Sequence, residues 1–254
     1  MATFQKCVSP EENKAKVSFY LLNGLVMTGL AIGLIVWIIA SFGVGLVVVG
    51  GIILLRYLFS GVTARMIRAQ GVVVSKHQLP HIQKEINAVR SLFEFHKDVP
   101  VVILPHSALN ALALKLAGKR MIILFSQVVE AVENDPAQLR ALLAHEFCHQ
   151  ALDFSGIEQF ALIKPARFQS ARELTCDRAA LLAANSLEST RMLLRKLAAG
   201  KELAAQLNDQ ALSDEATELY SGLTGWFLKN YLTHPPVGTR LNNVCDFAAE
   251  QGIA

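Results

Sequence analysis

The sequence contains no block of consecutive lysines and arginines, no internal repeat and no low-complexity segment. Its net charge of +3 is small, whereas a protein that neutralises many phosphates is visibly more basic, so no nucleic-acid partner is expected. The four cysteines are far apart and form no C-x-x-C pair, which argues against a disulfide framework and against a thiolate zinc site. A reducing compartment is the simplest expectation.

A second absence is charge: no charged residue occurs from Val17 to Leu55. As one helix, this run would be roughly 58 Å long, nearly twice the hydrocarbon core of a bilayer, which is about 30 Å. The glycine-containing stretch Ala40–Gly45 divides it into halves of near-spanning length, about residues 17–40 and 44–59. The sequence therefore predicts a transmembrane helical hairpin over residues 17–60, between a tail of residues 1–16 and a domain of residues 61–254.

Positive residues flank the hairpin on both sides, and its turn carries no charge. They are Lys6, Lys14 and Lys16 before it, and Arg56, Arg65, Arg68 and Lys76 after it. The positive-inside rule then places both ends of the hairpin in the cytoplasm. Its spans are expected to contact membrane lipid. A cleaved signal peptide is disfavoured, because its apolar region would be only about 7–15 residues long. We expect an integral protein of the bacterial inner (cell) membrane with a cytoplasmic domain.

The downstream domain alternates helical and strand patterns. Apolar residues at helical spacing predict an amphipathic helix over 79–95, and apolar runs predict short strands over 99–104 and 120–125. Residues 106–114 are consistent with a loop feeding an edge strand or with a helical turn. Start signals at Ser9–Pro10 and Asp135–Pro136 predict further helices. Others are expected from Pro165 to about Ala184, over 189–207, and after 213–215 as far as Tyr231. The expected fold is mainly α with a small β-sheet.

One of these helices contains His145-Glu146-Phe147-Cys148-His149. Histidines four residues apart lie on one helix face, so both imidazoles can reach one metal ion while Glu146 points to the same place. This H-E-x-x-H pattern is typical of zinc hydrolases, although histidines and glutamates also occur on exposed helix surfaces. Cys148 is expected to be a small buried hydrophobe, as is Cys176.

A catalytic zinc ion usually has three protein ligands, so one more is needed. Glu173 is the best candidate, because a turn near Gly156 lets the next helix fold back, whereas Glu158 follows the motif too closely. Asp177, one turn after Glu173, can accept a hydrogen bond from a ligand histidine. Two alternatives remain. Either acid can instead pair with neighbouring arginines, and Ser170–Glu173 also fits a capping box that would start the helix later.

Three blocks follow one another along the chain: His145–His149, then Glu173-Leu174-Thr175-Cys176-Asp177, and then Thr233-His234-Pro235-Pro236 with Arg240. In order and spacing they resemble the membrane-bound zinc metallopeptidases of the HtpX heat-shock protease and CAAX prenyl endopeptidase group. In addition, Asn110-Ala111-Leu112-Ala113 is similar to that family's Asn-Ala-Phe-Ala block, with Leu112 in place of phenylalanine. The similarity extends over about residues 77–248.

The resemblance implies an α+β zincin-type (gluzincin) domain that holds one Zn²⁺ ion per chain through His145, His149 and Glu173, with Asp177 supporting the site. It implies that His234 and Arg240 line the site, where either can stabilise an oxyanion, although both residues also fit a simple turn and a surface charge. The block Asn110, Ala111, Leu112 and Ala113 would form a sheet edge at which a substrate peptide adds as a strand. Further spans usual in HtpX-type proteins have no counterpart between Gly156 and Pro165. A compact form with two N-terminal spans is expected.

These expectations describe a membrane-anchored zinc metalloendopeptidase that cuts membrane or misfolded proteins, with Glu146 taking the proton of a zinc-bound water. The alternative is a non-catalytic, zinc-stabilised membrane adaptor that keeps the fold. The intact Glu146 argues against it, because an adaptor has no chemical need for that carboxylate. A transport role lacks support, since no charged residue lies within the spans. Substrate, cleavage specificity and oligomeric state stay open.

Overall fold

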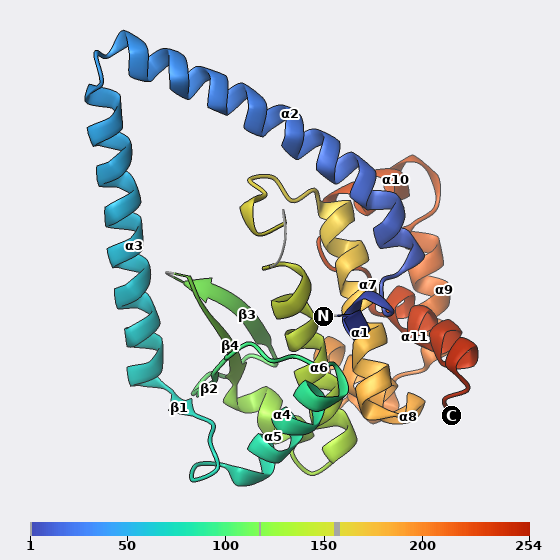
Figure 1. Ribbon diagram of the computed structural model, residues 1–254. Coiled ribbons are helices and arrows are strands. Elements are labelled where there is room, and N and C mark those ends of the chain that lie inside the picture. Colours follow the sequence, from blue (N-terminus) through green and yellow to red (C-terminus); the bar gives the residue numbers. More distant parts are fainter. Residues whose placement is uncertain (1, 117, 155–157) are drawn as a thin grey trace.

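A computed structural model describes residues 2–116, 118–154 and 158–254 of the chain. Two long helices, α2 (Pro10–Ala40) and α3 (Val44–Gln70), meet at an apex outside a mainly helical domain (Figure 1). Both are long and apolar enough to cross a membrane. The predicted break lies at the apex, where Phe42 and Gly43 adopt left-handed φ values of 51° and 86°. Ser9 caps α2 by accepting a hydrogen bond from the Glu12 N–H, as its sequence indicates.

The two helices diverge from the apex instead of packing side by side along their length (Figure 1). The first turns of α2 pack on α7 (Ala166–Ala184), where Phe19 stacks on Phe168 with ring centroids 4.1 Å apart. The Asn23 side chain then holds the main chain of Leu162 and Ile163 through three hydrogen bonds. One face of α2 is therefore covered by the domain as far as Asn23, although Val17 and Leu21 on the other face are exposed. The part of α2 that is exposed on all sides begins later than the predicted span of residues 17–40.

The far end of α3 packs on a four-stranded sheet, with Ala64 buried against Met121 and Ile123. The strands are β1 (Val72–Val73), β2 (Val101–Leu104), β3 (Ala111–Leu116) and β4 (Lys119–Phe125), in the order β1-β2-β4-β3. Strand β2 runs parallel to β4, and β3 is antiparallel to it. The two strands predicted from apolar runs are β2 and β4, and the segment left open between a loop and a helical turn forms the edge strand β3.

The other face of the sheet is covered by α6 (Pro136–Leu152), which packs against α4 (Pro80–Leu92) and α7. Asp135 caps α6 as expected, accepting hydrogen bonds from the Ala137 and Gln138 N–H groups. The predicted end of this helix near Gly156 concerns a residue outside the described ones; the last helical residue is Leu152. Helix α7 begins at Ala166, so the later start from a capping box at Ser170 is not adopted.

Residues 1–16, expected as a tail, contribute to the core. Helix α1 (Ala2–Gln5) brings Phe4 onto Phe93, with ring centroids 4.0 Å apart, and both Phe4 and Cys7 are fully buried. The division into residues 1–16, 17–60 and 61–254 stays a prediction, but the first segment is packed against the third.

The C-terminal helices differ from their predicted bounds in two places. Helix α8 (Leu187–Ala199) ends at Gly200, whose φ of 87° stops the helix predicted to reach residue 207. The single helix expected up to Tyr231 is divided in two at Tyr220–Gly222, where Gly222 has a φ of 62°. The remaining elements are α5 (Ser126–Val132), the 3₁₀ turns Glu158–Phe160 and Ala204–Gln206, α9 (Asp209–Leu219), α10 (Gly222–Tyr231) and α11 (Val237–Gln251).

Candidate metal centre and active site

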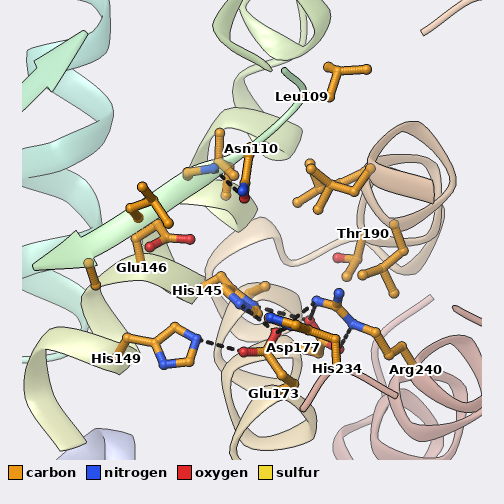
Figure 2. A pocket seen from close by; sticks show the side chains of 18 of the residues that line it. Leu109, Asn110, His145, Glu146, His149, Glu173, Asp177, Thr190, His234 and Arg240 are labelled. Carbon is orange, nitrogen blue, oxygen red and sulfur yellow. Dashed lines mark hydrogen bonds and ion pairs between the residues drawn. The ribbon is translucent and has the colours of Figure 1, made fainter. Parts of the chain in front are cut away.

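The predicted site residues of α6 and α7 face one another across a cavity of about 550 Å³ (Figure 2). His145 and His149 project from α6, and Glu173 lies opposite on α7, the neighbouring helix that packs most extensively on α6. The Nε2 atoms of His145 and His149 lie 3.4 Å and 3.2 Å from the Glu173 carboxylate oxygens. Two ligands about 2.0–2.1 Å from one zinc ion at the tetrahedral angle are separated by about 3.3 Å. Each of the two distances, which end on different oxygens of Glu173, therefore matches that of a ligand pair around one zinc ion.

Each histidine also has a carboxylate behind its other ring nitrogen. His145 Nδ1 lies 3.1 Å from Asp177, as expected for a supporting acid. His149 Nδ1 lies 2.8 Å from Asp153, which the sequence reasoning missed. Asp153 follows His149 by four residues, the same helical spacing that singles out Asp177 after Glu173, so this signal was present. Acids in these positions fix the tautomer in which Nε2 is free for a metal ion.

The charges of the site support one another. Burial lowers the pKa of His145, but its contacts with Asp177 and Glu173 outweigh burial and raise the pKa to about 9. Burial would raise the pKa of Glu173, yet hydrogen bonds from His145, His149 and His234 hold it well below its ordinary value. Glu173 is thus a carboxylate surrounded by three imidazoles, an anion concentrated where a cation is needed.

Cys176 gives a second possible donor set, because its sulfur and one ring nitrogen of each histidine all lie within 4.8 Å of one another. The thiol is fully buried and does not line the cavity, whereas Glu173 does. Burial, together with the neighbouring Cys148, raises the pKa of Cys176 well above its ordinary value. A metal ion binds the thiolate, so a thiol kept protonated is the poorer ligand. Cys148 and Cys176 are both buried, as expected.

Glu146 lies between the two histidines and the start of β3 (Figure 2). Its side chain lines the cavity, and within the described part of the chain it forms no hydrogen bond or ion pair. Burial raises the pKa of Glu146 above its ordinary value, against the opposing effect of His145 and His149. A raised pKa brings a carboxylate closer to neutral pH, which suits a group that takes up and returns a proton.

The C-terminal block completes the wall of the cavity. His234 precedes α11 and places Nδ1 3.2 Å from Glu173, with 70% of its side chain exposed. Arg240, in the first turn of α11, donates two hydrogen bonds of 2.7 Å and 2.6 Å to Asp177. Burial would lower the pKa of Arg240, but Asp177 raises it, so the guanidinium is a permanent charge. Its fork orients Asp177, which in turn contacts His145.

Strand β3 closes the cavity on the remaining side, where Asn110, Ala111, Leu112 and Ala113 line it. The sheet edge implied for this block is therefore next to the two histidines. The Asn110 carbonyl accepts a hydrogen bond from the Phe125 N–H, so in an antiparallel ladder the main chain of Leu112 also faces β4. The Ala111 N–H donates to Asn110 Oδ1 at 2.8 Å. The C=O of Ala111 and the N–H and C=O groups of Ala113 then face outward, where an extended peptide can pair with them.

A buried ion-pair network lies beneath Asp153. Arg172 of α7, only 2% exposed, donates 3.1 Å hydrogen bonds to both carboxylate oxygens of Glu12 in α2. The same guanidinium donates to Asp153 at 3.3 Å and to Glu158 at 2.6 Å. The start of α2 is thus connected through Arg172 and Asp153 to His149. Nothing in the sequence pairs Glu12 with a residue 160 positions later.

The sequence profile of peptidase family M48 matches residues 76–247, which contain all of the site residues above. The chain belongs to peptidase family M48. Plastoglobule-localized metallopeptidase 48, a chloroplastic protein of Arabidopsis thaliana, is 30% identical to this M48 chain over 195 residues. The matched part covers 65% of this chain and 56% of that relative, so the chain spans about half the length of the curated relative that it matches. No solved structure matches it. The family is one of metal-dependent peptidases.

Proposed function

We propose that this chain is a membrane-anchored zinc metalloendopeptidase of the HtpX and CAAX prenyl endopeptidase type, which hydrolyses peptide bonds of membrane or misfolded proteins. One observation carries the proposal: two histidines backed by acids share a buried carboxylate beside a free Glu146. His145, His149 and Glu173 would hold one zinc ion. When bound, zinc supplies a Lewis acid that polarises a carbonyl and lowers the pKa of water to about 7.

The residues around that ion have separate roles in the proposal. Glu146 takes a proton from the attacking water and returns it to the leaving amine, which its free carboxylate allows. His234 is the better candidate for hydrogen bonding to the developing oxyanion, because it is exposed to the cavity. Arg240 has its Nε and one terminal nitrogen engaged by Asp177, so we assign it the orientation of Asp177.

Substrate binding is assigned to the outer edge of β3. A peptide that adds there as an antiparallel strand gains main-chain hydrogen bonds from Ala113 and from the Ala111 carbonyl, and its backbone then passes in front of the cavity. Such recognition depends little on side chains, which suits a peptidase that acts on unfolded segments of many proteins.

Membrane anchoring is supported by the exposed apolar side chains of α2 and α3 and by the positive residues in the second half of α3 and after it. We propose that the two helices insert into the bacterial inner membrane and that the peptidase domain stays on the cytoplasmic side. Further apolar side chains are exposed in the segment that Asn23 holds and in α10, namely Phe160, Leu162, Leu223, Trp226, Phe227 and Tyr231. Aromatic residues of this kind are typical of the membrane–water interface.

The test is peptidase activity of the full chain, solubilised in neutral detergent, on an unfolded protein. We expect Glu146→Gln to lower turnover by about 10²–10⁴-fold, as for the loss of a general base, and a chelator to abolish turnover until zinc is returned. Glu130→Gln, the same change at an exposed carboxylate, is the control and should be neutral.

Two results would contradict the proposal. Activity that survives both the chelator and Glu146→Gln excludes this chemistry. A folded, zinc-loaded chain that is inert towards every unfolded substrate favours the alternative, a zinc-stabilised membrane adaptor.

A further inference from the structure

A second cavity, of about 690 Å³, lies at the base of α3, away from the candidate metal centre. Its walls are the second half of α3, the segment before β2, and the start of β4. The lining shares no residue with the cavity around His145. M48 peptidase chemistry gives no role to this cavity.

The lining of this cavity is strongly positive. Five of its side chains are cationic, and Asp98 is its single carboxylate. The cations are Arg65 and Arg68 of α3, Lys97, and Lys119 and Arg120 of β4. Across residues 2–116, 118–154 and 158–254, none of the five forms an ion pair with an acid. The lining therefore carries a net positive charge, and none of its cations is paired with an acid in the described part of the chain.

One of these cations, Arg120, is held by neutral groups. Arg120 donates hydrogen bonds to the main-chain carbonyls of Gln150 and Phe154, which fix the guanidinium without cancelling its charge. Burial lowers the pKa of Lys97, and the nearby charges of Arg120 and Lys115 lower it further. A ligand that carries negative charge would relieve this repulsion.

The wall on the α3 side is apolar. Tyr57, Leu58 and Val62 line the cavity with 53–59% of their surfaces exposed. They continue the exposed apolar surface of the first half of α3, and Arg65 follows Val62 by less than one helical turn. Arg56, which is exposed and precedes Tyr57, does not line the cavity. Among the residues of α3 that do line it, the side chains thus change from apolar to cationic, as the boundary between acyl chains and headgroups requires.

We propose that this cavity binds the phosphate-bearing headgroup of an anionic phospholipid, while the acyl chains of the lipid lie along Tyr57, Leu58 and Val62. Clusters of lysine and arginine just cytoplasmic of a membrane helix attract anionic lipids in general, and here a preformed cavity gathers them around one site. The inference rests on the proposed membrane anchoring by α2 and α3. It does not depend on peptidase activity.

The experiment measures binding of fluorescent phosphatidylglycerol and fluorescent phosphatidylcholine to the full chain in neutral detergent micelles. We expect the anionic lipid to bind at least tenfold more tightly than the zwitterionic lipid. Arg65→Glu/Arg68→Glu should weaken phosphatidylglycerol binding by about tenfold or more. Lys76→Glu/Lys84→Glu, which changes the net charge equally at exposed positions outside the cavity, should leave binding within about twofold.

Three results would overturn the inference. Equal weakening in both double variants indicates general attraction to the protein surface. Equal affinity for the two lipids indicates that the headgroup is not recognised. Displacement of the lipid by inorganic phosphate at the same concentration as by unlabelled phosphatidylglycerol indicates a phosphate site without a lipid preference.

Folding and anchoring are checked separately. Arg65 and Arg68 are exposed, so the thermal unfolding of their double variant should match that of the unchanged chain. Flotation of the unchanged chain with neutral vesicles, resistant to alkaline carbonate, reports membrane insertion alone. Failure of the anchoring proposal is thereby distinguished from failure of the lipid site.

Discussion

At the scale of single residues, Glu173 has an unusual environment for a buried acid. Its two oxygens face His145 and His149, and His234 approaches from the exposed side. Removing one partner of a buried charge network leaves the others unpaired, so the cluster is stable only as a set. A divalent cation at its centre would use the same nitrogens and oxygens as ligands.

Zinc titration distinguishes Glu173 from Cys176 as the third ligand. We expect Glu173→Ala to weaken zinc binding by far more than the 10–100-fold that is typical when a group behind a ligand is lost. Cys176→Ala should leave zinc affinity nearly unchanged, because the thiol is buried outside the cavity and remains protonated. Competition against a fluorescent chelator at fixed pH measures both. A larger loss of zinc affinity in Cys176→Ala than in Glu173→Ala would reverse the assignment of the third ligand.

The Glu12–Arg172 pair invites a double-mutant cycle. Arg172→Met should destabilise the fold by about 3–5 kcal/mol, because Glu12 is fully buried and would lose its guanidinium. Adding Glu12→Gln should recover part of the loss, with a coupling energy of about 0.5–3 kcal/mol. Urea unfolding at fixed zinc concentration is the measurement.

Arg167→Met is the matched control for this cycle, since Arg167 is an exposed arginine on the same helix. It should change the free energy of unfolding by no more than about 0.5 kcal/mol. Additive single effects of Glu12→Gln and Arg172→Met would show that the contact does not contribute to stability.

Residue patterns on one helix were readable from the sequence, and contacts between distant elements were not. His145, Glu146 and His149 follow from helical spacing, and Glu173 with Asp177 from the need for one more ligand. Asp153 obeys the same four-residue rule and was overlooked. The Arg172–Glu12 contact depends on how α2 packs on α7, which no local spacing encodes.

At the scale of elements, β3 has two inequivalent edges. Leu112 directs its main chain towards Ile123 of β4, whereas Ala113 directs its N–H away from the sheet. Proline at an edge strand is tolerated when the lost N–H faces outward. A proline at Leu112 therefore tests folding, and a proline at Ala113 tests substrate binding.

Ala113→Pro should lower kcat/KM on an unfolded substrate by about tenfold, the equivalent of one main-chain hydrogen bond, with little loss of stability. Ala113→Val keeps the N–H and should retain most of the activity. Leu112→Pro removes a hydrogen bond within the sheet and should instead destabilise the fold. Initial rates and thermal unfolding of the three variants are compared. Unchanged kcat/KM in Ala113→Pro would exclude strand addition at this edge.

Elements with regular hydrophobic spacing, an apolar run or a clear helix N-cap occur where they were predicted, as in α4, α6, β2 and β4. Strand β3 could not be assigned, because Ala-Leu-Ala-Leu is compatible with helix or strand and only pairing with β4 decides between them. Helices α9 and α10 were merged, because apolar residues continue through the break at Gly222.

At the scale of the whole molecule, the residues that precede the apolar hairpin pack into the downstream domain, which composition alone does not reveal. Polar residues before an apolar run usually indicate a tail, which is why residues 1–16 were predicted to lie outside the domain. In the structure, Phe4 and Cys7 are buried in the main core, and Phe19 is buried on α7. The N-terminal segment and the first turns of α2 are thus part of the core of the domain.

A chain shortened to residues 61–254 tests this arrangement. It retains every candidate metal ligand but lacks Phe4 and Phe19, and burial of each such ring contributes about 3–5 kcal/mol. It also leaves Arg172 without Glu12. Because a domain is stable by only about 5–15 kcal/mol, we expect the shortened chain to be largely unfolded and to bind zinc weakly.

Adding a separate peptide of residues 2–24 should restore zinc binding and cooperative unfolding, since it supplies the missing rings together with Glu12. The same peptide with Phe4→Ala and Phe19→Ala should fail to do so. If residues 61–254 alone bind zinc as tightly as the full chain and unfold at the same temperature, residues 1–16 contribute nothing to the fold. If the peptide restores zinc binding as expected, the contacts of Arg172 with Glu12 and Asp153 make the metal centre depend on how α2 packs on α7.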